Sequence, residues 1–370
     1  HLIFIVKIKN IMTVCILGNS LTALTLAKAL VNCEINVELF YNKNDYKISE
    51  TRTIGITKNN IDFFNKEIID IEKIIWNIKK IEIFSDNFGK KKLINFNTNK
   101  NQLFSIIKNY KLYQLLKKKL LRNKFFKSKL TREINLSFLD KYELIINCDA
   151  SNFITNKYFS KKIVKKYNSY AHTTTITHEK ISNDTASQIF TKKGPLAFLP
   201  VSNNKTSIVF SARSFNNQKK EKIEQIIKDN NFKYTIKNID EINSFELKSL
   251  NLRSYYHNNI LAFGDLLHKV HPLAGQGFNM TIRDIKILLE IIKKKLEVGL
   301  LLDSSVNSEF QKKVRHKNFV FSNGIDLIHE FFDIERKMKS NLLSKSVKFV
   351  GNYSPINKIF TQLADRGELF

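Results

Sequence analysis

One stretch of the sequence joins a short apolar run to a long amphipathic segment. It reads Gly264-Asp265-Leu266-Leu267-His268-Lys269-Val270-His271-Pro272-Leu273-Ala274-Gly275-Gln276-Gly277-Phe278-Asn279-Met280. Ile260–Phe263 before it predicts a buried strand, and Gln276–Lys294 predicts a long helix. Asp265 follows the strand directly, where a carboxylate can accept a hydrogen bond from a sugar-like hydroxyl. Gly275 and Gly277 leave the helix amides open to a flat or charged ligand, and Pro272 stiffens the turn before them. The stretch therefore predicts a ligand-binding connection in an α/β protein.

A second connection of this kind lies near the start of the chain. Thr13–Leu17 predicts a strand, Ser20–Val31 a helix with apolar residues at i, i+3 spacing, and Ile35–Phe40 a second strand. Such a βαβ unit implies a parallel sheet with a right-handed crossover.

The turn of this unit carries part of a dinucleotide-binding pattern. That pattern has glycine at three positions, and here Gly18 is followed by the small substitutes Ser20 and Ala23. The helix N-terminus still offers amides to a phosphate, although a tight βα turn in any α/β protein has the same appearance. The ribose-binding acid expected at the end of the second strand falls at Tyr41, and Glu38 comes three residues too early.

The pattern changes from about residue 167 onward. Consecutive short strands broken by polar turns predict a mostly antiparallel sheet. They are Ser169–His178, Ala186–Phe190, Leu196–Val201 and Ser207–Ala212. The other predicted elements are strands at Ile81–Ser85, Lys92–Phe96, Tyr142–Asn147 and Lys233–Asn238, helices at Leu103–Leu121 and Lys219–Asp229, and mainly helix from Ser304. The fold class is therefore α/β, with a Rossmann-like parallel sheet interleaved in sequence with an antiparallel domain and followed by a helical C-terminus.

The composition is that of an ordinary globular protein with an unusual charge. The 370 residues predict about two domains at roughly 150 residues each. With 43% hydrophobic and 26% charged residues, wholesale disorder, collagen and a small disulfide scaffold are excluded. The net charge of +27 suggests nucleic acid or an anionic membrane as a partner. Because the lysine runs are dispersed through a chain rich in Lys, Asn and Ile, we favour compositional bias over a dedicated polyanion site.

Cysteine content and hydropathy indicate the compartment. Cys15, Cys33 and Cys148 are too few and too scattered for a disulfide framework or a zinc site, which suggests the reducing cytoplasm. Cys148 is expected to be a buried, inert thiol. No apolar stretch reaches about 18 residues, so no transmembrane helix is expected. We expect residues 1–11, which precede Met12, to be an upstream read-through or a variable extension.

The stretch from Asp265 to Asn279 resembles the second FAD-binding motif of class A flavoprotein aromatic monooxygenases. Its His-Pro-x-Ala-Gly-Gln-Gly-x-Asn form is similar to the ubiquinone-biosynthesis hydroxylase branch, which includes 2-octaprenyl-6-methoxyphenol hydroxylase. Three further segments resemble this branch: Arg52–Thr57, Gly194–Pro200 and Asn357–Gly367. Asp149-Ala150 stands where the family has Asp-Gly. The resemblance covers about residues 12–367.

The resemblance implies an enzyme and its cofactor. It implies a monooxygenase that uses FAD, NAD(P)H and O2 to hydroxylate the ring of a polyprenyl phenol in ubiquinone biosynthesis, through a flavin 4a-hydroperoxide. The implied cofactor-binding residues are Gly18, Ser20, Ala23, Arg52, Asp149, Asp265, Pro272, Gly275, Gln276, Gly277 and Asn279. No catalytic residue is selected, although Tyr170, His172 and Tyr255 are polar candidates near the implied pocket. The implied FAD-binding parts are 12–75, 103–165 and 255–300, the substrate-domain parts are 76–102 and 166–254, and 301–370 is a helical region.

The implied partners follow from the substrate. A polyprenyl phenol partitions into membrane, so the enzyme would work at a membrane surface, peripheral on the inner membrane, within a ubiquinone-biosynthesis complex and without a specific nucleic acid. A basic face would help there. The aromatic residues Phe319, Phe321, Phe331 and Phe332 would dock to lipid or partner proteins, or would pack in the core, which we favour.

Three alternatives stay open. The chain could be another flavoprotein of the same fold, such as a prenyl reductase or a hydroxylase of soluble phenols. It could be a flavin-free or weakly active homologue that serves as a basic binding or assembly subunit, since Ser20, Tyr41 and Ala150 depart from the family pattern. A metal bound by Asp265, His268 and His271 is disfavoured, because a mononuclear site needs further ligands.

Overall fold

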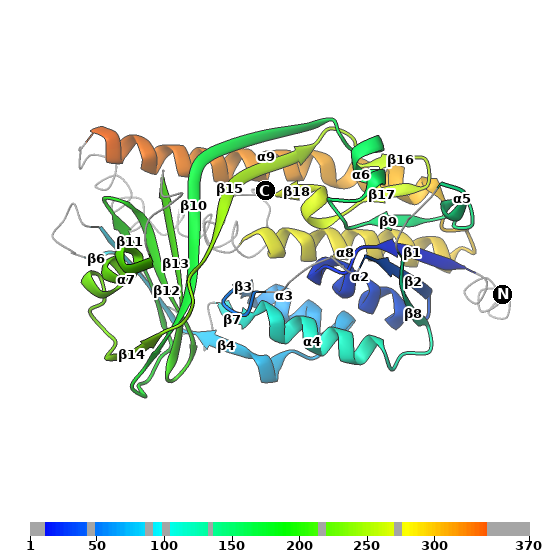
Figure 1. The fold of residues 1–370 in the computed structure, drawn as a ribbon. Coiled ribbons are helices and arrows are strands. Elements are labelled where there is room, and N and C mark those ends of the chain that lie inside the picture. The colour runs from blue at the N-terminus through cyan, green and yellow to red at the C-terminus, as the bar shows by residue number, and fades with distance from the viewer. Residues whose placement is uncertain are drawn as a thin grey trace.

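The computed structural model describes residues 12–42, 49–85, 92–97, 104–131, 136–213, 220–269 and 276–338. These residues form a six-stranded sheet, a nine-stranded sheet and a three-stranded sheet. The six-stranded sheet and its helices lie at one end of the molecule and the nine-stranded sheet lies at the other (Figure 1).

The six-stranded sheet has the order β16-β17-β9-β1-β2-β8, and all its neighbours are parallel except β16 and β17. Its strands are β1 (Thr13–Leu17), β2 (Asn36–Tyr41), β8 (Phe126–Leu130), β9 (Ile145–Asn147), β16 (Tyr256–His257) and β17 (Ile260–Ala262). The helices packed with it are α2 (Leu21–Asn32), α4 (Asn109–Leu120) and α8 (Gln276–Glu297). The parallel Rossmann-like sheet predicted from the sequence is therefore confirmed.

The nine-stranded sheet has the order β18-β15-β10-β13-β12-β11-β5-β6, with β14 paired to β10. Its strands are β5 (Lys80–Ser85), β6 (Lys92–Asn97), β10 (Lys162–His178), β11 (Thr185–Thr191), β12 (Gly194–Ser202), β13 (Lys205–Arg213), β14 (Ile236–Ile239), β15 (Asn243–Leu252) and β18 (His268–Lys269). All pairs are antiparallel except β11 with β5. The helix α7 (Lys220–Asp229) packs on one face of this sheet. The mostly antiparallel second sheet is also confirmed.

The small sheet corrects one prediction. It consists of β3 (Thr53–Thr57), β7 (Phe104–Lys108) and β4 (Ile75–Ile78), and it lies between the two large sheets (Figure 1). The predicted helix Leu103–Leu121 is therefore wrong over Phe104–Lys108, and α4 begins only at Asn109. The apolar residues there fit a strand because β7 pairs with β3 on one side and β4 on the other.

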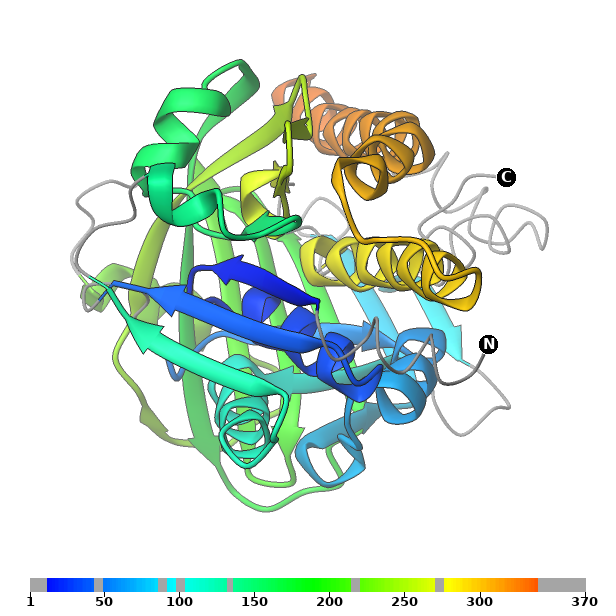
Figure 2. The same ribbon diagram turned by 90° about the vertical axis from the view of Figure 1, so that its right-hand side faces the viewer.

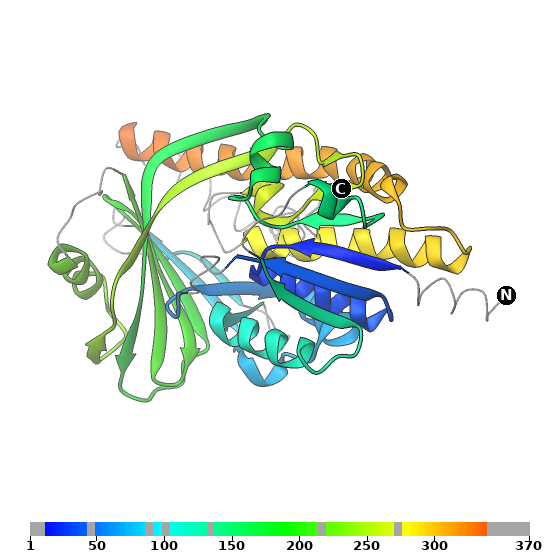
Figure 3. The same ribbon diagram turned by 45° about the vertical axis from the view of Figure 1, so that its right-hand side comes forward.

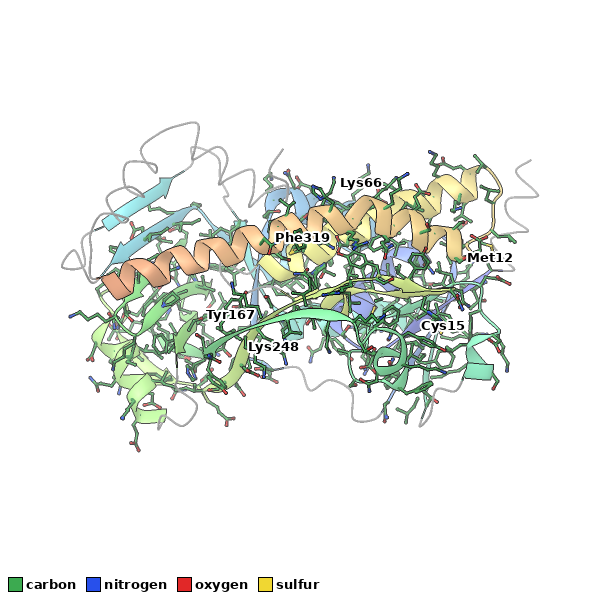
Figure 4. All side chains as sticks on the ribbon, turned by 90° about the horizontal axis from the view of Figure 1, so that it is seen from above. Met12, Cys15, Lys66, Tyr167, Lys248 and Phe319 are labelled. Carbon is green, nitrogen blue, oxygen red and sulfur yellow. The ribbon has the colours of Figure 1, made fainter. Side chains whose placement is uncertain are left out.

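The remaining described elements are short, apart from one long helix. The short ones are α3 (Lys58–Phe63), η1 (Phe64–Ile68), η2 (Glu72–Ile74), α5 (Leu136–Leu139), α6 (Phe153–Tyr158) and η4 (Gly264–Leu266). The long helix α9 (Ser304–Met338) lies beside α8 and runs toward the nine-stranded sheet (Figures 2 and 4). On α9, Phe321 is buried, whereas Phe319 is 52% exposed. The side chains of Phe331 and Phe332 lie outside the described residues.

Two of the expected domain boundaries fall inside strands. The boundary between residues 75 and 76 divides β4, and the boundary between 165 and 166 divides β10. β10 is 17 residues long, and its pairing with β15 shifts register between Lys166 and Ser169. Among the described helices, none is long and apolar enough to cross a membrane.

Candidate functional site

The carboxyl ends of the central parallel strands meet at one edge, where three loops follow β1, β9 and β17. We call them the carboxyl-edge loops: Gly18–Ser20, Cys148–Ser151 and Phe263–Asp265. Backbone hydrogen bonds continue the sheet into them, from Cys148 N to Leu17 O at 2.9 Å and from Phe263 N to Asn147 O at 2.9 Å. Figure 3 shows β1 and β2 running toward the nine-stranded sheet, so this edge faces the other domain. In open α/β sheets this is the edge at which ligands bind.

Gly18 has to be glycine in this arrangement. Its φ is +102°, and a Cβ atom added to it would lie 3.1 Å from Cβ of Asp149. A side chain would therefore be strained by its backbone conformation and crowded by the loop after β9. The structure thus brings two of the predicted site residues, Gly18 and Asp149, into contact.

Ser20 and Ala23 take the places of the second and third glycines without disturbing the turn. Ser20 is the N-cap of α2, and its Oγ accepts a hydrogen bond from Ala23 N at 3.2 Å. Ala23 is completely buried, so its methyl group is accommodated where the helix packs on the sheet. The first-turn amides of α2 remain directed at the carboxyl edge, where the positive end of a helix favours a phosphate.

Asp265 lies exposed in the turn η4, beyond the end of β17. The preceding Gly264 has φ +67°, and a Cβ atom on it would lie 2.6 Å from Cγ2 of Thr22. The turn that carries Asp265 therefore packs directly against the first turn of α2. An exposed carboxylate beside a helix N-terminus can accept hydrogen bonds from a ligand that also carries a phosphate.

Two other acids near this edge are engaged within the protein. Asp149 Oδ1 accepts hydrogen bonds from N and Oγ of Ser151, at 2.8 and 2.7 Å, which closes its own turn. Glu38 lies in the middle of β2, where Oε2 accepts from Tyr142 Oη at 2.6 Å and pairs with Lys129 Nζ at 3.1 Å. Burial opposes ionisation of Glu38, but these two donors prevail and lower the pKa of its carboxyl. Glu38 therefore stabilises the pairing of β2 with its neighbours. The last residue of β2, where the ribose-binding acid is expected, is Tyr41.

Arg52 lies between the two large sheets. Its guanidinium lies 4.2 Å from the ring centroid of Phe245 on β15, a cation–π distance. The neighbouring Thr51 bonds to Thr173 on β10, with 3.2 Å between their hydroxyl oxygens, and accepts from Asn243 Nδ2 at 3.2 Å. These contacts fix the segment at Arg52 against the nine-stranded sheet. The sequence patterns do not predict the contact with Phe245, because they do not predict the strand β15.

Asn279 joins α8 to the small sheet. Its Nδ2 donates to Gly55 O at 2.8 Å, and its Oδ1 accepts from Asn60 Nδ2 at 2.8 Å. It is only 7% exposed. Both ends of its side chain therefore bond to protein groups, and they hold the start of α8 against the segment that follows Arg52. Gly277 is partly buried in the first turn of α8, the side chain of Gln276 is not described, and Pro272 and Gly275 lie outside the described residues.

Of the three polar candidates for catalysis, Tyr170 and His172 share one face of the nine-stranded sheet, and Tyr255 lies apart from them. His172 shares a sheet face with Phe210, whose cluster includes α7, and its Nδ1 lies 2.7 Å from Ser244 Oγ. Burial lowers the pKa of His172. Tyr255 is buried beneath α9, where its backbone N donates to Gln311 Oε1 at 2.7 Å. Tyr170 is half-buried on β10, two residues from His172 and hence on the same face. Neither His172 nor Tyr255 thus lies on the sheet face that carries Thr173 and contacts the segment at Arg52.

A metal site is not assembled in the part of the chain that the structure describes. No group of three or more His, Cys, Asp or Glu side chains there could hold a metal ion. His268 instead lies with Nε2 2.6 Å from Oδ2 of Asp284. His271 lies outside the described residues.

The comparisons with known proteins agree with this geometry. Residues 157–304 match the family model described as FAD binding domain, a range that includes Asp265 and Asn279. The chain is 28% identical to 3-demethoxyubiquinol 3-hydroxylase of Escherichia coli over 157 residues, which are 40% of each chain. It is 29% identical to ubiquinone biosynthesis monooxygenase COQ6 of Drosophila melanogaster over 118 residues, which are 32% of this chain and 25% of that one. The matched segments therefore span less than half the length of these curated relatives.

Solved structures show the same fold over nearly the whole chain. The p-nitrophenol 4-monooxygenase PnpA of Pseudomonas putida superposes with a TM-score of 0.75 at 11% identity and covers 95% of this chain and 97% of its own. HpxO of Klebsiella pneumoniae, solved with FAD and uric acid, also gives 0.75 at 11% identity, over 97% and 99% of the two chains. The predicted fold class and the resemblance to the ubiquinone-biosynthesis hydroxylases are confirmed, and the match of residues 157–304 to the FAD binding domain supports FAD as the expected cofactor.

Proposed function

We propose that this chain is an FAD-dependent monooxygenase that hydroxylates the aromatic ring of a polyprenyl phenol in ubiquinone biosynthesis, with NAD(P)H and O2 as co-substrates. One observation carries the proposal: the exposed Asp265 is packed beside the N-terminus of α2 through the contact of Gly264 with Thr22. An acceptor for hydroxyl groups and an anion-binding helix end side by side suit a dinucleotide. The ubiquinone hydroxylases among the curated relatives suggest the substrate class.

The carboxyl-edge loops supply the groups that would hold FAD. The amides at the start of α2 would bind the pyrophosphate, Gly18 with its positive φ would allow the tight turn that leads to them, and Ser20 would keep that turn capped. Asp265 would accept hydrogen bonds from hydroxyl groups of the cofactor. Gln276 and Gly277 would contribute through the N-terminal amides of α8, which favour negative charge.

Bound FAD would supply the oxygen activation that amino-acid side chains cannot provide. The protein would supply binding and orientation. Asn279 fixes the start of α8 against Gly55 and Asn60, so the positive end of this helix keeps a constant position. Arg52, held over Phe245, adds a fixed positive charge between the domains. We propose no catalytic base, since His172 and Tyr255 both lie away from this face.

We propose further that the chain works at a membrane surface, peripheral on the inner membrane and in contact with a ubiquinone-biosynthesis complex. The substrate class is lipophilic, and the net charge of +27 suits an anionic leaflet. Each Lys or Arg near such a surface contributes about 1 kcal/mol of binding.

The first experiment is the visible absorption spectrum of the purified chain. We expect absorption bands at about 375 and 450 nm and release of FAD on denaturation. We expect Asp265→Asn to weaken FAD binding by about ten- to a hundredfold, since a lost charge-assisted hydrogen bond costs about 1.5–3 kcal/mol. The matched control is Asp229→Asn, because Asp229 is exposed at the end of α7 on the outer face of the other domain. NAD(P)H oxidation and ring hydroxylation are then compared between a prenylated phenol and its unprenylated counterpart.

Each outcome has a meaning. A colourless protein that cannot be reconstituted with FAD contradicts the monooxygenase and favours a flavin-free assembly subunit. Equal kcat/KM for the two phenols retains the flavoprotein but contradicts the polyprenyl substrate. Equal FAD binding by Asp265→Asn and Asp229→Asn contradicts the assigned role of Asp265.

A further inference from the structure

A buried cluster of charged side chains lies behind the turn that carries Asp265. Asp284, on the third turn of α8, is fully buried. Its Oδ2 lies 2.6 Å from Nε2 of His268, and its Oδ1 lies 3.1 Å from Nη2 of Arg283. The side chains of His268 and Arg283 are only 1% and 8% exposed. All three side chains are turned away from solvent, unlike the exposed Asp265.

The cluster connects three elements. His268 belongs to β18, Asp284 and Arg283 to α8, and Asn318 to α9. Asn318 accepts a hydrogen bond from Arg283 Nη2, and its Nδ2 donates to Asp284 Oδ2 at 3.4 Å. In the view of Figure 1, β18 lies between α8 below it and α9 above it. The single carboxylate of Asp284 is thus the point at which these elements are joined.

The charges around Asp284 make the junction of β18, α8 and α9 rigid. Burial of the Asp284 carboxyl opposes ionisation, but Arg283 and His268 outweigh it and hold the pKa of Asp284 below its ordinary value. A buried carboxylate cannot leave such partners without a large desolvation cost. The distance between His268 and Asp284 is that of a short charge-assisted hydrogen bond. Movement of His268 away from α8 is therefore strongly disfavoured.

This cluster lies close in sequence to Asp265, the residue proposed to bind the cofactor. Asp265 stands between Gly264, which packs on Thr22, and His268, which is tied to Asp284. Only Leu266 and Leu267 lie between Asp265 and His268. The exposed carboxylate is therefore on a turn anchored at both ends, by steric contact at one and by the buried hydrogen bond of His268 with the Asp284 carboxylate at the other. An anchored ligand loses less conformational entropy when it binds its partner.

We propose that Asp284 is a positioning residue of the cofactor site, acting through His268 to hold the turn that presents Asp265. This rests on the proposed function, in which Asp265 binds hydroxyl groups of FAD. The chemistry requires a donor at the position of His268 Nε2 and an acceptor at Asp284 Oδ2. A glutamine at residue 268 can still donate from its amide nitrogen, whereas a leucine cannot.

The test compares four variants of the full chain: Asp284→Asn, His268→Gln, His268→Leu and the control Lys293→Gln. Lys293 is also on α8 and also forms an ion pair, with Glu67 at 2.7 Å, but near the far end of the helix. FAD affinity is measured by quenching of flavin fluorescence. We expect Asp284→Asn and His268→Leu to raise the Kd for FAD by about tenfold or more, as loss of a group that orients a ligand often does. His268→Gln and Lys293→Gln should stay within about threefold of wild type.

A second measurement separates this proposal from the proposed function. Hydrogen exchange in the apoprotein, over peptides covering residues 260–269, reports on the turn without any cofactor. We expect faster exchange in Asp284→Asn and His268→Leu, and wild-type exchange in Lys293→Gln. If wild type binds no FAD but exchange changes as expected, the proposed function fails and the anchoring of the turn stands. If exchange is unchanged, or if His268→Gln is as impaired as His268→Leu, the positioning role of Asp284 is wrong.

Discussion

Substitution of Gly264 by alanine tests the contact that joins the two halves of the proposed site. The residue has φ +67°, which costs a non-glycine residue about 1–2 kcal/mol. The added Cβ would also lie 2.6 Å from Cγ2 and 3.1 Å from Oγ1 of the buried Thr22. Overpacking of this kind typically costs about 1–3 kcal/mol. We therefore expect Gly264→Ala to lower the free energy of unfolding by about 2–5 kcal/mol.

A second glycine provides the control for backbone strain alone. Gly299, between α8 and α9, has φ +74°, but a Cβ atom there would have no heavy atom within 4 Å. Gly299→Ala should therefore cost only the conformational part, about 1–2 kcal/mol. The difference between the two variants isolates the steric contact of Gly264 with Thr22.

A double variant tests the same contact from the other side. Thr22→Ser removes the methyl group that Gly264→Ala would meet, and by itself it should cost about 0.8 kcal/mol for one buried carbon. In the background of Thr22→Ser, the cost of Gly264→Ala should fall toward that of Gly299→Ala. Urea-induced unfolding of the apoprotein, followed by circular dichroism, measures all four variants. If Gly264→Ala costs no more than Gly299→Ala, the packing of the Asp265 turn on α2 is wrong.

Two further predictions concern groups near β1. Glu38→Gln should destabilise the protein by about 1–2 kcal/mol at pH 7, because the ionised carboxylate accepts from Tyr142. Since the pKa of Glu38 is lowered on folding, that stability is present above the unfolded pKa of about 4.3 and is lost as pH falls through the folded value. The difference in Tm between Glu38→Gln and wild type should therefore disappear below about pH 4. A difference in Tm that stays constant with pH contradicts the ion pair. Burial raises the pKa of Cys15 and Cys148, so iodoacetamide should label Cys33 first in the native protein, and mass spectrometry showing equal labelling would contradict their burial.

Local patterns predicted the parts of the fold that depend on neighbouring residues. The βαβ unit at the start of the chain and the strand-to-helix connection at Asp265 are set by short apolar runs and by turn residues, which the sequence displays directly. Gly18 and Gly264 both have positive φ, as their positions at strand ends suggest. The prediction that β-rich segments follow residue 167 succeeded for the same reason.

The errors arose where pairing with distant strands decides the structure. Phe104–Lys108 has apolar residues that suit a helix or a strand, and only its pairing with β3 and β4 selects the strand. β15 was missed because its sequence, Asn243–Leu252, is only partly apolar, yet it pairs with β10 along ten residues. β8 was missed because it is a lysine-rich, largely exposed edge strand. Partner strands that lie tens of residues away in the sequence leave no periodic signal of their own.

The candidate site shows the same limit for side chains. The contact of Arg52 with Phe245 could not be predicted without β15. His268 was interpreted through its neighbours in the loop, whereas its partner Asp284 lies sixteen residues onward, on the inner face of α8. Asn279 belongs to the cofactor motif, but its side chain is used to fasten α8 to the small sheet. Motif spacing thus identifies which residues gather at the edge, and only the packing shows which of them are left to meet a ligand.

The departures from the glycine pattern bear on whether the chain has kept its cofactor. A binding turn that had lost its function would be expected to lose its geometry as well, but here the substituted residues maintain it. Ser20 caps α2, and Ala23 fits where the helix meets the sheet. Gly18 remains at the single position where a Cβ would meet Asp149 and where φ is positive. A pyrophosphate would bind amides at the N-terminus of α2; Ser20 uses the amide of Ala23 for its cap, so the amides of Leu21 and Thr22 would be the ones offered. The replacements at Ser20 and Ala23 are therefore an argument for a working cofactor edge, because each has a structural use in the folded turn.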